Sequence, residues 1–179
     1  MIFVTVGTHE QPFNRLVEAV DQWAASSDED VLIQTGYSTI TPKHCRFKDF
    51  LPREEMVENI KNARIVITHG GPCCYTEVQT FGKIPIVVPR NHKFGEQFDD
   101  HQVEICREYK SRYNHIILIE DIATLSDSID GYDAIVKDMG QTSGLSHNME
   151  FCKELSRAVD RLFGEEVHFF EGGRTAKTT

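Results

Sequence analysis

The segment 69–77, HGGPCCYTE, carries residues well suited to chemistry. Gly70 and Gly71 permit backbone conformations closed to other residues, and the proline after them favours the first turn of a helix. The amino end of such a helix offers free N–H groups and a positive dipole end to an anion. His69 could hydrogen-bond or partly neutralise a diphosphate there, and Glu77 could accept two hydrogen bonds from a vicinal diol such as a ribose. A glycine turn that only joins a strand to a helix, with Glu77 solvated, explains the spacing equally well.

The sequence GTHE follows an apolar run near the start of the chain. Gly7 and Thr8 could form a second backbone nest for the same ligand, and His9 or Glu10 could transfer a proton. The alternative is an ordinary strand-to-helix turn in which Thr8 or Glu10 caps the helix.

A third polar segment is EQFDDHQVE, at the start of another expected helix. Asp100, His101 and Gln102 could bind the hydroxyl groups of a sugar through short polar contacts. The alternative is an acidic first turn that complements the helix dipole.

Two other signals are discounted. The segment 28–30, DED, matches a pattern used by metal-dependent sugar transferases, but it lies in an expected exposed turn before a strand, so no metal site is predicted. Cys73 near a helix start could be nucleophilic, with His69 beside it. Neither Cys73 nor Cys74 has a C-x-x-C partner, so a small apolar role fits them better.

Composition limits the class of protein. The formal net charge of −9 argues against a protein that binds the nucleic-acid backbone. Five cysteines without C-x-x-C spacing indicate a reducing compartment. The first strand follows the initiator methionine directly, and no apolar run approaches the length of a membrane span, so we expect a cytoplasmic protein without a leader.

Apolar runs alternate with amphipathic stretches along the chain. Strands are expected at 2–6, 31–34, 45–47, 65–68, 84–88 and 116–119. Helices are expected at 13–20, 54–63, 75–81, 97–109, 122–129 and from about 146 to 163. The predicted organisation is one domain, 1–163, and a small polar tail, 164–179, that is partly disordered.

This alternation predicts an α/β fold, Rossmann-like, with a mostly parallel sheet covered by helices on both faces. Ligands of such folds bind at the carboxyl ends of the strands. Those ends are expected at 7–9, 68–71 and 89–91, so the candidate residues should share one rim of the sheet.

Three segments and the opening of the chain resemble a known family of enzymes. The segments ITHGGPCCYTE, GKIPIVVPR and FDDHQ, in this order, resemble the nucleotide-sugar half of GT-B glycosyltransferases of family 28. The opening MIFVTVGTHEQPFNRLVEAVD is similar to the small catalytic subunits of bacterial two-component glycosyltransferases that make capsular polysaccharide and exopolysaccharide.

The resemblance implies an inverting hexosyltransferase that uses a UDP-sugar, without a cofactor or catalytic metal, and a polyprenyl-diphosphate-linked acceptor. It also implies half an enzyme, because a separate membrane-associated subunit binds the acceptor in this group. That partner would recruit the cytoplasmic chain to the inner face of the membrane.

The resemblance also assigns roles to residues of this chain. His69 and the Gly70-Gly71 turn would face the diphosphate, Glu77 would hold the ribose, and Thr8 would lie near the phosphates. Gln102, with Asp100 or His101, would bind the donor sugar. The base that activates the acceptor usually comes from the acceptor half of such enzymes; within this chain His9 and Glu10 are the candidates.

The turn departs from the family pattern at two positions. Cys73 stands where the family has glycine, and Cys74 stands where it has serine or threonine. A thiol is a weak donor, and losing one charged hydrogen bond costs about 1.5–3 kcal/mol. The departure leaves a rival open: a non-catalytic accessory subunit that enhances or anchors a partner transferase.

Overall fold

A computed structural model describes residues 1–139 of the chain. The helix predicted from about 146 to 163, the predicted tail 164–179 and Cys152 lie outside the described residues. Within residues 1–139, no helix has the length and apolar character needed to cross a membrane.

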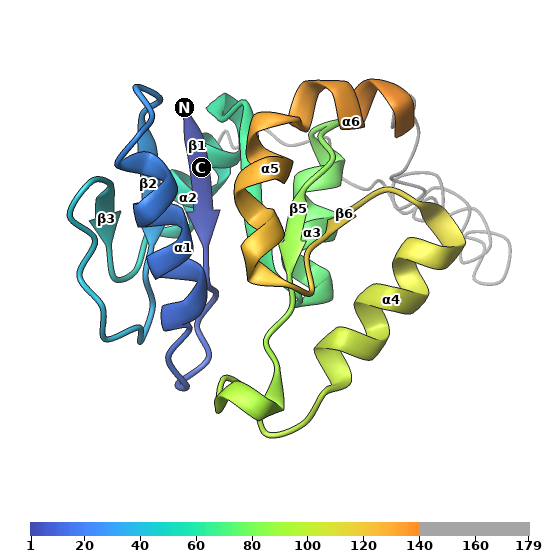
Figure 1. Cartoon of the computed structure of the whole chain (residues 1–179), viewed down its shortest axis with the longest axis horizontal. Helices are drawn as coiled ribbons and strands as arrows, with labels where there is room; N and C mark the ends of the chain where they lie inside the picture. Colours follow the sequence, from blue (N-terminus) through green and yellow to red (C-terminus); the bar gives the residue numbers. More distant parts are fainter. Residues whose placement is uncertain (140–179) are drawn as a thin grey trace, which may run out of the picture. The chain divides into compact units, whose positions relative to one another are not determined.

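A six-stranded parallel sheet forms the centre of the fold (Figure 1). Its strands are β1 (Ile2–Thr5), β2 (Val31–Gln34), β3 (Arg46–Lys48), β4 (Ile65–His69), β5 (Ile86–Val88) and β6 (Ile117–Leu118). They lie in the order β3-β2-β1-β4-β5-β6, and every neighbouring pair is parallel. The predicted fold class is therefore confirmed.

Helices cover both faces of the sheet. In Figure 1, α1 (Asn14–Ala24) and α5 (Leu125–Asp130) lie in front of the strands, while α2 (Arg53–Asn62) and α3 (Pro72–Thr80) lie behind them. The alternation of side chains along β1 serves both layers. Ile2 and Val4 join the core under α1 and α5, whereas Phe3 joins the core under α2 and α3.

The connection from β3 to β4 returns the chain to the other side of β1. The first three strands run outward from β1 in one direction, and the last three run outward in the other. Such a reversal is the point at which open α/β sheets bind ligands, outside the carboxyl ends of the strands. Here it falls between β1 and β4.

Most boundaries differ from those predicted by a few residues, and three differences concern the later helices. The helix α4 (His101–Tyr113) begins four residues later than expected. Its N-cap is Asp100, and just before it the Asp99 carboxylate accepts a hydrogen bond from the His101 N–H, a local contact that competes with a helical start at Gln97. The expected helix 122–129 divides into a 3-10 turn, Ile122–Thr124, and α5. A helix that the sequence did not predict, α6 (Tyr132–Met139), follows α5.

Candidate active site at the carboxyl edge of the sheet

The turns after β1 and β4 meet around the ring of His69. Gly7 has a φ of +79°, and a Cβ placed there would lie 2.5 Å from His69 Nε2. A Cβ on Gly71 would lie 2.3 Å from His69 Cε1. Both glycines are therefore required by close contact with the imidazole. The structure brings together two segments that the sequence analysis placed on one rim.

His69 is held as a neutral ring. The Gly71 N–H donates to its Nδ1 at 3.0 Å, so the proton of the neutral tautomer is on Nε2. Burial lowers the pKa of His69 to about 4, and the nearby charge of Arg90 acts in the same direction. Of the two roles considered for this residue, hydrogen bonding to a diphosphate fits this state, and neutralising its charge does not.

Helix α3 begins directly after this ring. Gly71 is its N-cap and Pro72 its first residue, so the helix starts three residues before the predicted 75, and Pro72 lies at its entry as expected. The Cys74 N–H donates a hydrogen bond to the Gly71 carbonyl at 2.9 Å. The Cys73 N–H has no acceptor among residues 1–139, so it and the helix dipole are what this end offers to an anion.

The two cysteines differ in their surroundings. Cys73 is exposed, whereas Cys74 is half-buried and its Sγ lies 3.2 Å from His69 Nε2. Burial raises the pKa of the Cys74 thiol to about 11, so the thiol next to the histidine stays protonated at neutral pH. The structure thus pairs His69 with Cys74, not with the Cys73 of the thiol hypothesis, and provides no activated thiolate there.

Glu77 forms an ion pair that the sequence did not predict. Its carboxylate is bound by both terminal nitrogens of Arg53, one of them at 2.8 Å, and Arg53 is the first residue of α2. A carboxylate has about four acceptor positions, so the pair leaves Glu77 able to accept hydrogen bonds from a diol. Its predicted ribose contact remains a prediction.

Arg90 is the largest side chain that is fully buried among the described residues. Its guanidinium donates to the main-chain carbonyls of Val6 at 2.9 Å, Gln11 at 2.7 Å and Glu96 at 3.0 Å. Burial lowers the pKa of Arg90 to about 10, which leaves it charged at neutral pH. A fixed positive charge therefore lies beneath the turn that follows β1.

Gln102 faces the same junction from the first turn of α4. Its Oε1 accepts a hydrogen bond from the Arg90 N–H at 3.1 Å, and its side chain favours the charged form of His69. Asp100 and His101 are exposed, and the Asp100 carboxylate accepts from the His92 N–H at 3.0 Å. The Asp100 carboxylate therefore binds the loop after β5 and does not cap the helix, and the contacts of this segment with a sugar remain a prediction.

The candidate bases lie on the turn after β1. The His9 ring lies 5.8 Å from the ring of Phe98, which is 78% exposed, and the charge of His9 acts on His69. Thr8 and Glu10 are exposed. These residues are open to a second substrate, and their catalytic assignment remains a prediction.

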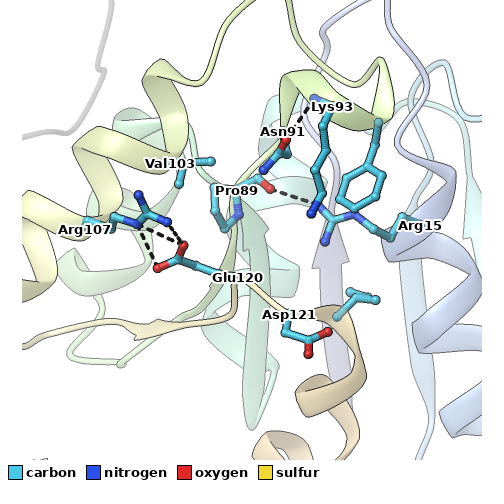
Figure 2. Close-up of a pocket in the computed structure, with 10 residues that line it drawn as sticks. Arg15, Pro89, Asn91, Lys93, Val103, Arg107, Glu120 and Asp121 are labelled. Carbon is cyan, nitrogen blue, oxygen red and sulfur yellow. Dashed lines mark hydrogen bonds and ion pairs between the residues drawn. The ribbon is translucent and has the colours of Figure 1, made fainter.

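A cavity of about 450 Å³ lies beside this site, between η1 (His92–Phe94), α4 and the segment that follows β6 (Figure 2). Arg107 pairs with Glu120 on one side, and Arg15 donates to the Pro89 carbonyl on the other. None of the residues predicted to bind the donor or act as base lines it.

The discounted acidic segment lies at the opposite edge of the sheet. Glu29 binds Arg64 and the amino terminus, and Asp30 binds Arg46. Across residues 1–139, no group of three or more histidine, cysteine or acidic side chains is placed to hold a metal ion. Asp28 and Asp30 are exposed and Glu29 is half-buried, in the loop between α1 and β2 where an exposed turn was expected.

Sequence reasoning missed two contacts that shape the site. Arg90 stood at a strand end but was given no role, although an arginine directly after the apolar run IPIVVP was the available signal. The pairing of Arg53 with Glu77 joins residues 24 positions apart, and no local pattern indicates it.

Comparison with known proteins shows the family and the fold. Among solved structures, one described as the glycotransferase of kitacinnamycin matches with a TM-score of 0.50 and 15% identity, over 89% of this chain and 42% of that chain. This likeness shows the fold alone, and the chain spans less than half the length of that protein. No curated protein matches the sequence.

The profile of the glycosyltransferase family 28 C-terminal domain matches residues 1–130. That range holds the whole sheet and every residue predicted for the site. The chain therefore belongs to the family of glycosyltransferase family 28 C-terminal domains and has the Rossmann-like fold of the nucleotide-sugar half of GT-B glycosyltransferases.

Proposed function

We propose that this chain binds a UDP-sugar at the carboxyl edge of its sheet and transfers the sugar, with inversion, to a polyprenyl-diphosphate-linked acceptor. The reaction serves the synthesis of capsular polysaccharide or exopolysaccharide and uses no cofactor or catalytic metal. A separate membrane-associated subunit binds the acceptor and recruits this chain to the inner face of the membrane.

One observation carries the donor half of this proposal. Gly7, His69 and Gly71 converge at the strand reversal between β1 and β4, beside the start of α3 and above the buried charge of Arg90. The free N–H of Cys73, the helix dipole and a buried cation together favour a diphosphate.

The same groups suggest how the reaction is accelerated. Transfer of the sugar leaves negative charge on UDP, and a preorganised positive field stabilises that charge as it develops. Nε2 of neutral His69 carries the proton and lies 3.2 Å from Cys74 Sγ, a weak acceptor, so a phosphate oxygen would replace the thiol as the acceptor of this hydrogen bond. Glu77 then orients the nucleotide through the ribose.

The aromatic pair Tyr37 and Phe50 adds a nucleotide-binding feature to this rim. The rings lie 5.3 Å apart in an edge-on arrangement, and they are 50% and 46% exposed. Phe50 lies three residues before Arg53, the partner of Glu77. An exposed aromatic surface after β2 and β3, on the carboxyl edge of the sheet, is suited to stacking with a base.

The test is a thermal shift of the full chain with UDP and common UDP-sugars at millimolar concentration. We expect UDP to raise the melting temperature, because a ligand that binds only the folded state stabilises it. Glu77→Ala should remove the shift. Glu108→Ala breaks a comparable exposed pair, with Arg112, and should keep it.

Absence of any shift with UDP or UDP-sugars in the wild type would instead support the rival, a non-catalytic accessory subunit. Sugar transfer by the reconstituted pair of subunits separates the two functions further. Cys73→Ser should keep the sugar-transfer activity. An inactive Cys73→Ser variant would instead support the thiol-enzyme hypothesis.

A further inference from the structure

We propose that Arg90 is a positioning residue of the donor site, whose buried charge holds the turn after β1 in place and draws the diphosphate toward it. This inference rests on the proposed UDP-sugar function and goes beyond the residues that the family resemblance supplies.

The hydrogen bonds of Arg90 connect three segments that are distant in sequence. The guanidinium binds the carbonyls of Val6 and Gln11, which flank the candidate turn 7–10, and the carbonyl of Glu96 in the loop after β5. The main-chain N–H of Arg90 binds Gln102 of α4. One residue therefore sets the relative position of the first turn and the proposed sugar contact.

The turn after β4 packs against Pro89, the residue that precedes Arg90. A Cβ on Gly70 would lie 3.0 Å from the Cα of Pro89, which precedes Arg90 in the chain. All of the segments predicted to contact the donor through its phosphates thus meet at positions 89 and 90.

The charge of Arg90 is only partly compensated. None of its hydrogen bonds goes to a carboxylate within the described part of the chain, and its Nε has no partner there. The nearest acid, Glu96, binds Arg15 through both carboxylate oxygens, at 2.9 Å and 2.8 Å. The group of Arg15, Arg90 and Glu96 therefore keeps a net positive charge.

Burial of a charge without an ion pair is costly, so a structural explanation alone is weak. The field has a visible effect on its neighbour, because Arg90 disfavours the protonated form of His69. A position that repels a cation on His69 attracts an anion placed beside it. The chain keeps a costly cation where a diphosphate would bind.

The test uses the full chain with Arg90→Met and Arg90→Lys, UDP affinity by calorimetry, and the pKa of His69 by NMR. Arg90→Met should weaken UDP binding by roughly 10–100-fold, the loss expected for a charged hydrogen-bonding group, and raise the pKa of His69. Arg90→Lys keeps the charge without the planar fork, so it should recover most of the affinity and keep the pKa of His69 low. Arg64→Met, which breaks ion pairs at the opposite edge, should leave UDP affinity unchanged.

Two outcomes would overturn the inference. One is UDP binding by folded Arg90→Met within roughly threefold of the wild type. The other is an Arg90→Lys variant as weak as Arg90→Met with an equally raised His69 pKa, which would show that packing alone matters. If Arg90→Met does not fold, UDP affinity and the His69 pKa are measured for Arg90→Lys alone. Near wild-type values of both would support the inference, and weak UDP binding with a raised His69 pKa would overturn it. If the wild type fails to bind UDP, the proposed function fails, while the His69 titration still decides the charge effect.

Discussion

Two cations flank strand β5, and each is bound by three main-chain carbonyl groups. Lys83, before the strand, donates from Nζ to Ile60 and Lys61 at 2.7 Å each and to Ala63. These carbonyls end helix α2, where acceptors are left unpaired and the dipole is negative. The position of Lys83 is fully explained by the stability of a helix end.

Arg90, after the strand, has no such explanation. Its carbonyl partners belong to loops, and it lies next to His69 and the start of α3, where the dipole is positive. Each end of β5 thus has a cation bound by three carbonyl groups, but only at Lys83 do those carbonyls belong to the negative end of a helix. The stability of a helix end accounts for Lys83, whereas a ligand of opposite charge accounts for Arg90 in our proposal.

The buried polar atoms without a hydrogen-bond partner also lie mostly near the carboxyl edge of the sheet. Five buried side-chain atoms lack a partner within residues 1–139: those of Gln11, Thr68, Arg90, Gln97 and His115. Gln11 lies in the segment that follows β1, Thr68 near the end of β4, and Arg90 and Gln97 in the segment that follows β5. Unpaired buried groups are rare in folded proteins and gather where function requires them.

The largest expected effect is on stability, at the structural end of β5. Lys83→Met leaves three carbonyls without their cation and should lower the free energy of unfolding by roughly 2–4 kcal/mol. UDP affinity should not change. Denaturant unfolding and calorimetry check the two claims, with the exposed Lys110→Met as control; weaker UDP binding by folded Lys83→Met would break the comparison.

The second effect is acid destabilisation through His69. Its pKa of about 4 in the folded chain lies below the ordinary 6.5, so the unfolded chain binds more protons between these values. Stability from this residue is complete above pH 6.5 and declines as pH falls to 4, by up to roughly 3 kcal/mol. Unfolding free energies at pH 7 and pH 4.5 measure it.

Carboxylates with lowered pKa values, such as Asp21, Glu29 and Asp30, also destabilise the fold in acid, so the control is His69→Gln. This variant should lose the part of the pH dependence that belongs to position 69. Equal slopes for the variant and the wild type would contradict a buried, neutral histidine.

The third effect separates backbone strain from contact with His69. Gly7 and Gly82 both have positive φ values, +79° and +71°, but a Cβ on Gly82 meets no atom of residues 1–139 within 4 Å. Gly82→Ala should cost roughly 1 kcal/mol of stability, and Gly7→Ala roughly 2–3 kcal/mol, because it also displaces His69. Only Gly7→Ala should weaken UDP binding in calorimetry; equal effects of the two would show that the contact is unimportant.

The smallest effect concerns the atypical turn. Cys74→Ser introduces the hydroxyl that the family has at this place, beside His69 Nε2. A hydroxyl is a better donor than a thiol, so UDP affinity should rise by roughly 2–5-fold. Cys45→Ser, at the start of β3 away from this turn, is the control; a lower affinity for Cys74→Ser would mean that the thiol is required.

The fold could be predicted because its signals are local. Apolar runs such as 2–6 and 65–68, separated by amphipathic stretches, require a parallel sheet, and a parallel sheet places its strand ends on one edge. This reasoning was enough to bring Gly7 and His69 to the same rim.

The electrostatics of the site could not be predicted because they depend on long-range contacts. The neutral state of His69 follows from its burial between two turns, and the role of Arg90 follows from carbonyls up to 84 positions away in sequence. The late start of α4 follows from the side chain of Asp99, which competes with the helix pattern that begins at Gln97.

The central claim is that the carboxyl edge of the sheet binds the nucleotide. Its most direct test is an amide NMR titration of the isotope-labelled full chain with UDP. The account predicts shifts concentrated in residues 7–10, 69–77, 90 and 102, with little change at Arg64 and Lys83. Unchanged spectra at millimolar UDP, or shifts centred on Arg64 and Lys83, would contradict it.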